Sequence, residues 1–190
     1  ARLIDLGWLE KLPLDKIPNS KNLVPNLVKP PSDPTGEYSL PWQAGTTGIA
    51  YNLKATGGKE LTSVADLWDP ALKGKVSMLT EMRDTIGLIA MSEGIDISTA
   101  NTIKQYQPAF DTLKEQVDNG QIRQFTGNEY VGPLEDGSLA ACFAWSGDVL
   151  GMENPDIRYV VPDSGGTLWF DAMVIPKGAS NVDDVAEWMN

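Results

Sequence analysis

Short apolar runs alternate with helix-like stretches through most of this chain, and this alternation constrains the fold more than any other feature. Helices are expected near 63–68, at 84–93 and at 100–118, where apolar residues repeat at helical spacing. We expect strands at 38–42, 47–53, 76–80, 121–126, 138–145, 158–162 and 168–176. Because strands that alternate with helices are typical of layered α/β domains, the sequence predicts an α/β fold with a mixed, mostly parallel sheet flanked by helices.

Local signals within this pattern mark where helices begin or break. Asp84 and Asp148 each follow a strand and precede a helical run, which is the position where an acidic cap is favoured. Pro108 falls inside the stretch 100–118, where proline removes a backbone donor. We therefore expect a kink or a break of that helix at Pro108.

The two ends of the chain differ from its middle. Leu3, Leu6 and Leu9 repeat at helical spacing from the first turn, which predicts a helix with no cap ahead of it. The segment 13–37 is rich in proline, and we expect an extended connector there because proline blocks helices. The uncapped start and the short final helical segment at 181–190 indicate a portion of a longer chain.

Charge and composition exclude several classes of function. Fifteen Lys and Arg stand against 26 Asp and Glu, a formal charge of −11, which argues against nucleic acid or an anionic membrane as the main partner. The absence of histidine excludes Ser-His-Asp and Cys-His catalysis and zinc sites built on imidazole. Neither common glycine-rich phosphate-binding motif occurs, and no apolar run approaches the roughly 20 residues that cross a bilayer. We expect no metal and no cofactor, and the negative charge suits a cationic ligand.

Acidic and aromatic residues recur directly after the expected strands. In α/β sheets, ligands gather at the carboxyl ends of the strands, where loops lead into helices. A carboxylate replaces the water around a protonated amine, at roughly 1.5–3 kcal/mol per hydrogen bond, and an indole face attracts ammonium by about 0.5–2 kcal/mol. The sequence thus predicts a site for a polyamine or similar organic cation, formed by Glu81, Asp84, Trp145, Asp148, Trp169 and Asp171.

Two other interpretations of these residues stay open. The tryptophans also fit core positions, and the acids also fit structural roles as helix caps or as partners of Arg83. Alternatively, two carboxylates can flank a glycosidic bond, so that Glu81, Asp148 and Asp171 would serve a glycoside hydrolase. Since nothing in their spacing favours hydrolysis and no catalytic motif is present, the residues favour a binding protein over an enzyme.

Five segments, taken in chain order, carry a family resemblance: YSLPWQAGTTGIAYN (38–52), SVADLWDPALKGKVSMLT (63–80), EMRD (81–84), AACFAWSGDV (140–149) and GGTLWFDAMVIPKGA (165–179). In this order they resemble the extracellular polyamine-binding proteins, which are the spermidine/putrescine-type solute receptors of ABC importers. The likeness extends from about Arg2 to Met189, and its most specific parts are the WSGD and WFD clusters.

The resemblance implies a fold and a domain organisation. The family folds as two α/β lobes of the type II periplasmic-binding-protein kind, joined by crossing strands, with the ligand in the cleft between them. We accordingly expect residues 1–43 to be a remnant of the first lobe with its connector. Residues 44–174 are expected to form the second α/β lobe with hinge crossings at both ends, and 175–190 to begin the return to the first lobe.

The resemblance also implies roles for single residues. Trp145 is similar to the family's stacking tryptophan, and Trp169 with Asp171 matches its Trp-x-Asp pair, in which the acid binds an ammonium group. Acids that meet amine groups are implied at Glu81, Asp84 and Asp148. The segment FTGNEY (125–130) departs from the family pattern, which leaves putrescine, spermidine and other cations open.

The partners implied by the resemblance are a polyamine ligand and the membrane permease of an ABC importer, with no catalysis and no nucleic acid. The intact protein is expected to be a periplasmic or extracellular monomer, with or without a lipid anchor. The main alternative is a sibling receptor for another small organic solute, such as an opine, an amino-acid derivative or a sugar.

Overall fold

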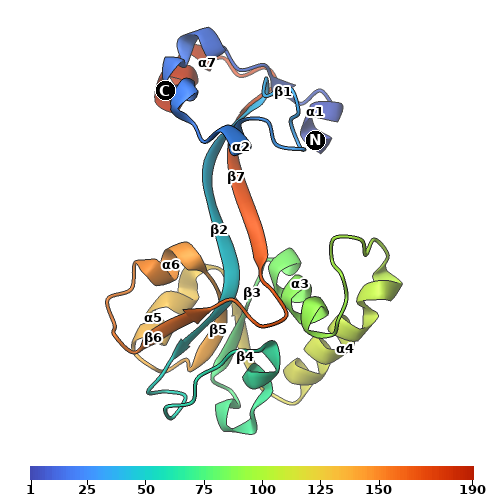
Figure 1. Cartoon of the computed structure of the whole chain (residues 1–190), viewed down its shortest axis with the longest axis vertical. Coiled ribbons are helices and arrows are strands. Elements are labelled where there is room, and N and C mark those ends of the chain that lie inside the picture. The colour runs from blue at the N-terminus through green and yellow to red at the C-terminus, as the bar shows by residue number, and fades with distance from the viewer. The chain divides into compact units, whose positions relative to one another are not determined.

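The computed structural model describes all 190 residues and divides into two compact units. Unit 1 comprises Ala1–Ala44 and Phe170–Asn190, and unit 2 is the continuous stretch Gly45–Trp169. Two long strands, β2 (Ser39–Asn52) and β7 (Thr167–Pro176), contribute residues to both units (Figure 1). The expected lobe boundaries near residues 43 and 174 stay a prediction.

Unit 2 is built on a mixed sheet whose strands run in the order β6–β2–β5–β3–β4. The strand bounds are β3 (Val76–Leu79), β4 (Ile122–Thr126), β5 (Ala141–Trp145) and β6 (Ile157–Val160). Strand β3 pairs in parallel with β4 and β5, whereas β2 runs antiparallel to β5 and β6. The predicted α/β class with a mixed sheet is therefore confirmed, and parallel pairing in this unit is confined to the β4–β3–β5 segment.

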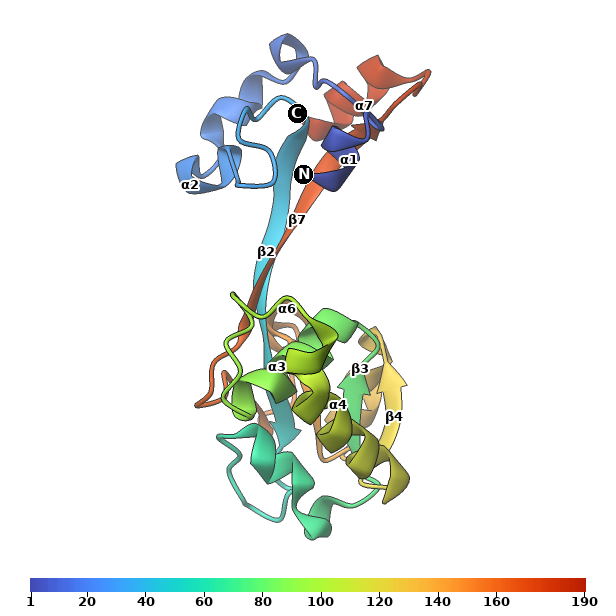
Figure 2. The ribbon, with the colours of Figure 1, turned by 90° about the vertical axis from the view of Figure 1, so that its right-hand side faces the viewer.

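Helices cover both faces of this sheet. The helices α3 and α4 lie on one face, and α5 and α6 lie on the other (Figures 1 and 2). Their apolar sides meet the strands in one core, in which Ile49, Met78, Leu88 and Phe143 are completely buried. The helical elements of unit 2 are η3 (Val64–Trp68), η4 (Pro70–Leu72), α3 (Met82–Ser92), α4 (Ile103–Asp118), η5 (Asn128–Tyr130), α5 (Val131–Glu135) and α6 (Ser146–Leu150).

Helix α4 corrects the expectation of a break at Pro108. The helix runs unbroken past this proline, and it begins three residues later than the predicted start. Thr102 and Gln105 form a reciprocal capping box at its first turn, and Phe110 and Leu113 pack against the core. Packing of this apolar face offsets the single backbone hydrogen bond that proline removes, because tertiary contacts supply most of a helix's stability in a protein.

Unit 1 contains short elements around a small core. Its bounds are α1 (Arg2–Asp5), β1 (Leu9–Glu10), η1 (Leu14–Lys16), η2 (Pro18–Asn22), α2 (Pro25–Val28) and α7 (Val182–Met189), with β1 antiparallel to β7. The core consists of Leu12, Ile17, Leu40, Ile175 and Ala186. None of the helices of either unit has both the length and the apolar character that crossing a bilayer requires.

Two expectations for the amino-terminal segment were wrong. The first helix ends at Asp5 rather than continuing through Leu9, because Gly7 turns the chain at a φ of 68°. The proline-rich segment is not simply extended, since Pro18 and Pro25 stand at the first positions of short helices. Proline is favoured there because its fixed φ suits the first turn and its missing N–H has no intrahelical partner.

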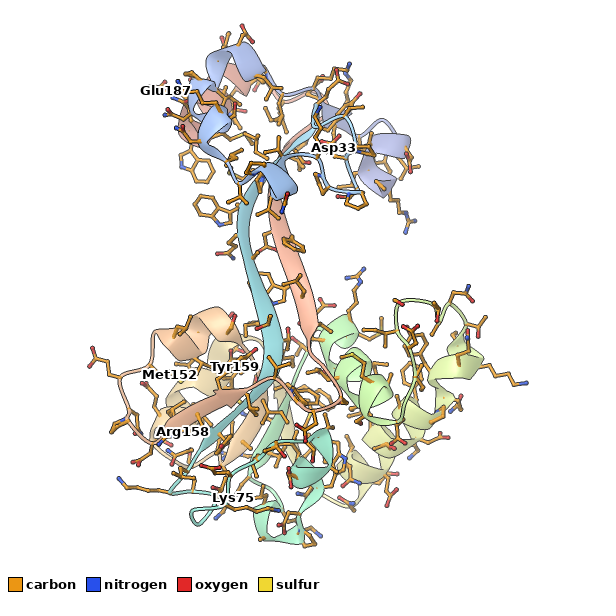
Figure 3. The ribbon with its side chains drawn as sticks, viewed as in Figure 1. Asp33, Lys75, Met152, Arg158, Tyr159 and Glu187 are labelled. Carbon is orange, nitrogen blue, oxygen red and sulfur yellow. The ribbon has the colours of Figure 1, made fainter.

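The loop before β2 is organised by one buried acid, Asp33, which is only 1% exposed. Its carboxylate accepts hydrogen bonds from the Thr35 and Ser39 hydroxyl groups and from the backbone N–H groups of Gly36, Tyr38 and Ser39, at 2.9–3.2 Å. Burial acts to raise the pKa of Asp33, but these hydrogen bonds outweigh it and hold the pKa below its ordinary value. Figure 3 shows Asp33 within this loop.

Candidate ligand-binding site

Parallel pairing of β3, β4 and β5 brings the residues that follow these strands to one edge of the unit 2 sheet. Side chains at this edge form a hydrogen-bonded group that we term the rim network. Its members are Asp84, Asn128, Tyr130, Trp145, Asp148 and Thr167. Three of the six residues predicted from the sequence, Asp84, Trp145 and Asp148, therefore lie in one network.

Asp84 is a buried acid in the first turn of α3, with 6% of its surface exposed. The indole Nε1–H of Trp145 donates to its Oδ2 atom at 2.9 Å, and the Thr167 hydroxyl donates to Oδ1 at 2.6 Å. Both donors are neutral. Each carboxylate oxygen is thus oriented by one hydrogen bond, while the charge of the group keeps no opposite charge beside it.

Asp148 is partly buried in the first turn of α6. Its Oδ2 atom accepts the Tyr130 hydroxyl at 2.6 Å and the Asn128 amide at 2.7 Å. The same Tyr130 oxygen accepts the backbone N–H of Trp145 at 3.0 Å, and the two rings lie with their centroids 6.4 Å apart. Tyr130 therefore links the acid to the backbone of the tryptophan.

The helix-capping roles expected for Asp84 and Asp148 were wrong. The cap of α3 is Glu81, whose side chain accepts the Arg83 backbone N–H at 3.1 Å. Helix α6 follows Trp145 without any side-chain cap. Both aspartates instead point to donors from distant parts of the chain, which local capping preferences do not register.

Neither Asp84 nor Asp148 takes part in any of the ion pairs of the structure, which all lie elsewhere. A carboxylate removed from water is costly unless it is paired or hydrogen-bonded. Hydrogen bonds from neutral groups meet this need only in part. The arrangement can therefore accept a cation from outside the chain, and a bound ammonium group would supply the missing charge.

The charge of the Asp84 carboxylate affects the pKa of a nearby phenol, that of Tyr159. Tyr159 on β6 donates to the backbone oxygen of Thr46, and its hydroxyl also lies 2.9 Å from the Thr46 hydroxyl (Figure 3). Burial raises the pKa of Tyr159, the hydrogen bond with Thr46 opposes the rise, and the negative Asp84 adds to it. The phenol remains protonated near neutral pH and adds no negative charge to the network.

Trp169 lies on β7 outside the rim network. Its ring covers Gly45, where an added Cβ would stand 2.4 Å from the indole, so only glycine fits beneath it. The indole N–H is buried and has no hydrogen-bond partner. A buried unpaired donor is uncommon and costs about 1–3 kcal/mol. The side chain is held by packing, with its one polar atom unsatisfied.

The remaining two predicted residues, Glu81 and Asp171, are exposed and join the rim network by no hydrogen bond or ion pair. Glu81 caps α3 and lies 3.5 Å from the Arg83 guanidinium, so that its charge is partly balanced within the chain. Asp171 belongs to unit 1 and accepts the Gln43 amide at 2.9 Å.

Sequence reasoning missed Asn128, Tyr130 and Thr167 as members of the network. In the sequence, Tyr130 follows the strand expected at 121–126 and ends the segment FTGNEY (125–130), which departs from the family pattern. The signal that could have identified it is a large aromatic residue directly after the strand 121–126, within a polar loop. Nothing in the sequence marks Thr167, because its role depends on a contact with a residue 83 positions away. No cluster of three or more His, Cys, Asp or Glu side chains is placed to hold a metal ion.

Comparison with known proteins decides the family. The profile of the family described as "Bacterial extracellular solute-binding protein" matches residues 1–190, which is the whole chain. The chain belongs to this family. The resemblance carried by the five sequence segments is thereby confirmed, and the family is one of extracellular proteins that bind solutes.

Individual members of the family resemble this chain over part of their own length. It is 29% identical over 186 residues to the spermidine/putrescine-binding periplasmic protein of Escherichia coli (strain K12), covering 97% of this chain and 53% of that protein. It is 31% identical over 191 residues to spermidine/putrescine-binding periplasmic protein 1 of Haemophilus influenzae, covering 97% and 51%.

A solved structure from Listeria monocytogenes, named for a spermidine/putrescine ABC transporter, matches with a TM-score of 0.91 at 31% identity. The match covers 100% of this chain and 58% of that one. The periplasmic-binding-protein type of fold is confirmed by this likeness. The chain spans about half the length of the curated relatives it matches.

Proposed function

We propose that this chain carries ligand-binding residues of a polyamine receptor that serves an ABC importer. The observation that carries the proposal is the pair of acids, Asp84 and Asp148, held by neutral donors around Trp145 and lacking any basic partner. An organic ammonium group fits this arrangement, because carboxylates take the place of its water and the indole offers a flat apolar wall. The names of the relatives support polyamines as the ligand class.

The mode of action in this proposal is capture without chemistry. The ligand is bound by hydrogen bonds and charge, and the receptor passes it to a membrane permease without catalysis and without a cofactor. We propose that the intact receptor works as a monomer, and that Trp169, Glu81 and Asp171 also contact the ligand. A receptor for an anionic solute would need other polar groups at the rim, since two unpaired acids repel anionic ligands.

A ligand screen on the 190-residue chain tests this proposal. We expect putrescine and spermidine to raise the melting temperature, because a ligand that binds only the folded state adds RT ln(1 + [L]/Kd) to stability. Affinity should be about millimolar, or about −4 kcal/mol, because Trp145 and Asp148 stay partly in water and Asp171 is exposed. Glutamate and sulfate should have no such effect, and turnover of a glycoside would instead support the hydrolase interpretation.

One outcome of the same screen opposes the proposal, and another opposes the expected affinity. If an anion raised the melting temperature and polyamines did not, the ligand class would be anionic and the polyamine proposal would be wrong. Submicromolar binding of putrescine would show that the exposure of these site residues to water weakens binding far less than we infer. Sodium chloride at matched ionic strength serves as the control for general salt effects.

The proposed ligand contact of Asp171 can be tested separately. We expect Asp171→Asn to lower putrescine affinity about threefold, because exposed charge pairs contribute only about 0.2–1 kcal/mol. Thermal stability should be unchanged, since the carboxylate is exposed and its one contact with Gln43 lies at the surface. NMR titration measures the affinity. An unfolded variant would assign Asp171 a structural role.

A further inference from the structure

We propose that Tyr130 is the positioning residue of the ligand site. In this proposal its hydroxyl group fixes the Asp148 carboxylate and the Trp145 backbone in one arrangement, so that the acid and the indole meet the same ammonium group. The inference rests on the proposed function. In it, Tyr130 does not touch the ligand but orients Asp148 and Trp145, which do.

The Tyr130 hydroxyl group both donates and accepts a hydrogen bond within the rim network. The hydroxyl donates to Oδ2 of Asp148 at 2.6 Å and accepts the Trp145 N–H at 3.0 Å. Asn128 donates to the same Oδ2 atom, and no group of the chain donates to Oδ1. The two donors thus turn one oxygen of Asp148 inward and leave the other oxygen for a ligand.

The placement of Tyr130 makes it a rigid support. Its side chain is completely buried in the core of unit 2, and it stands where η5 passes into α5. Burial and the Asp148 carboxylate both raise the pKa of the phenol, which keeps the hydroxyl protonated as a donor. A buried ring held on all sides orients its partners more tightly than water or an exposed amide does.

The alternative is that Tyr130 only satisfies a backbone donor. The N–H of Trp145 lies at the end of β5, where a water molecule could serve equally well. A purely structural role predicts a change of stability with no change of ligand affinity. A positioning role predicts that removal of the hydroxyl weakens binding and also uncouples Asp148 from Trp145.

The Tyr130→Phe substitution removes only the hydroxyl oxygen. We expect about tenfold weaker putrescine binding in an NMR titration of the 190-residue chain, a size in keeping with coupling between contacting residues. Tyr106→Phe is the matched control, because its hydroxyl donates to the backbone oxygen of Ala100 and touches no member of the rim network. The control should bind putrescine with unchanged affinity.

A second measurement needs no ligand. Asp148→Ala should shift the amide resonance of Trp145 in the parent chain, and should shift it much less in the Tyr130→Phe background, because Tyr130 carries the effect. Equal shifts in both backgrounds would overturn the coupling. A parent shift that is no larger than those of neighbouring amides would overturn it as well, even if Tyr130→Phe fails to fold.

The two proposals fail in different ways. A parent chain that binds no diamine removes the proposed function, and with it the role of Tyr130 in binding. A parent chain that binds putrescine together with a folded Tyr130→Phe variant that binds equally well overturns the positioning role alone. Weaker binding by Tyr130→Phe with an unchanged control supports both.

Discussion

Replacing Asp84 with asparagine should abolish detectable putrescine binding while leaving unit 2 folded. Removal of one partner from a desolvated charge pair costs about 2–5 kcal/mol of binding, which takes a millimolar affinity beyond the measurable range. Stability should stay within about 1 kcal/mol of the parent or rise, because the buried charge has no basic partner and its loss relieves a desolvation cost.

Asparagine can keep both contacts of Asp84. Its amide oxygen accepts the Trp145 indole N–H, and the Thr167 hydroxyl can rotate to accept the amide N–H. The matched control is Glu115→Gln, which removes the same charge from the exposed face of α4 and should change neither affinity nor stability. NMR titration and urea unfolding measure the two quantities. A destabilised Asp84→Asn chain that retains its affinity would make Asp84 a structural residue.

In unit 1, Asp33→Ala should lower the free energy of unfolding by about 3–5 kcal/mol, since it leaves several buried donors without an acceptor. Asp15→Ala is the control, because Asp15 is an exposed acid of the same unit. Urea unfolding followed by circular dichroism measures both. A loss below about 1 kcal/mol for Asp33→Ala would contradict the role assigned to this loop.

Acid should weaken unit 1 through the same residue. The pKa of Asp33 is lower in the folded state than its ordinary value, so the carboxylate contributes stability at pH values above the unfolded pKa of about 3.9. This contribution is lost as the pH falls through the folded pKa. The parent chain should be more stable than Asp33→Ala at pH 7, and this difference in the free energy of unfolding should shrink as the pH is lowered. Urea unfolding of both chains at a series of pH values measures it.

The sequence predicts the strands of unit 2 well because their patterns are local. The runs 76–80 and 138–145 are mainly apolar, 121–126 places Ile122 and Phe125 among polar residues, and each of the three is bounded by turn residues and contains a strand of the structure. Predictions failed where tertiary contacts outweigh local preference. Pro108 sits in a continuous helix because the helix packs on a core, and Pro18 and Pro25 begin helices in a segment expected to be extended.

The same division applies to the candidate site. Asp84, Trp145 and Asp148 could be found because they follow strands that end at one edge of the sheet. Their partners could not, since Thr167 reaches Asp84 across 83 residues and Tyr130 reaches Asp148 across 18. Helix-cap preferences favoured the wrong role for both acids, because these preferences take account only of neighbours in sequence.

The unpaired acids of the rim network also bear on how quickly a ligand arrives. Two carboxylates that take part in no ion pair, on a chain with a formal charge of −11, produce a negative field that reaches past the surface. Such a field guides cations during diffusion and can raise association rates by an order of magnitude or more. At an ionic strength of 0.1 M the field fades within about 10 Å, so added salt slows the capture of dications before it alters any contact in the bound state.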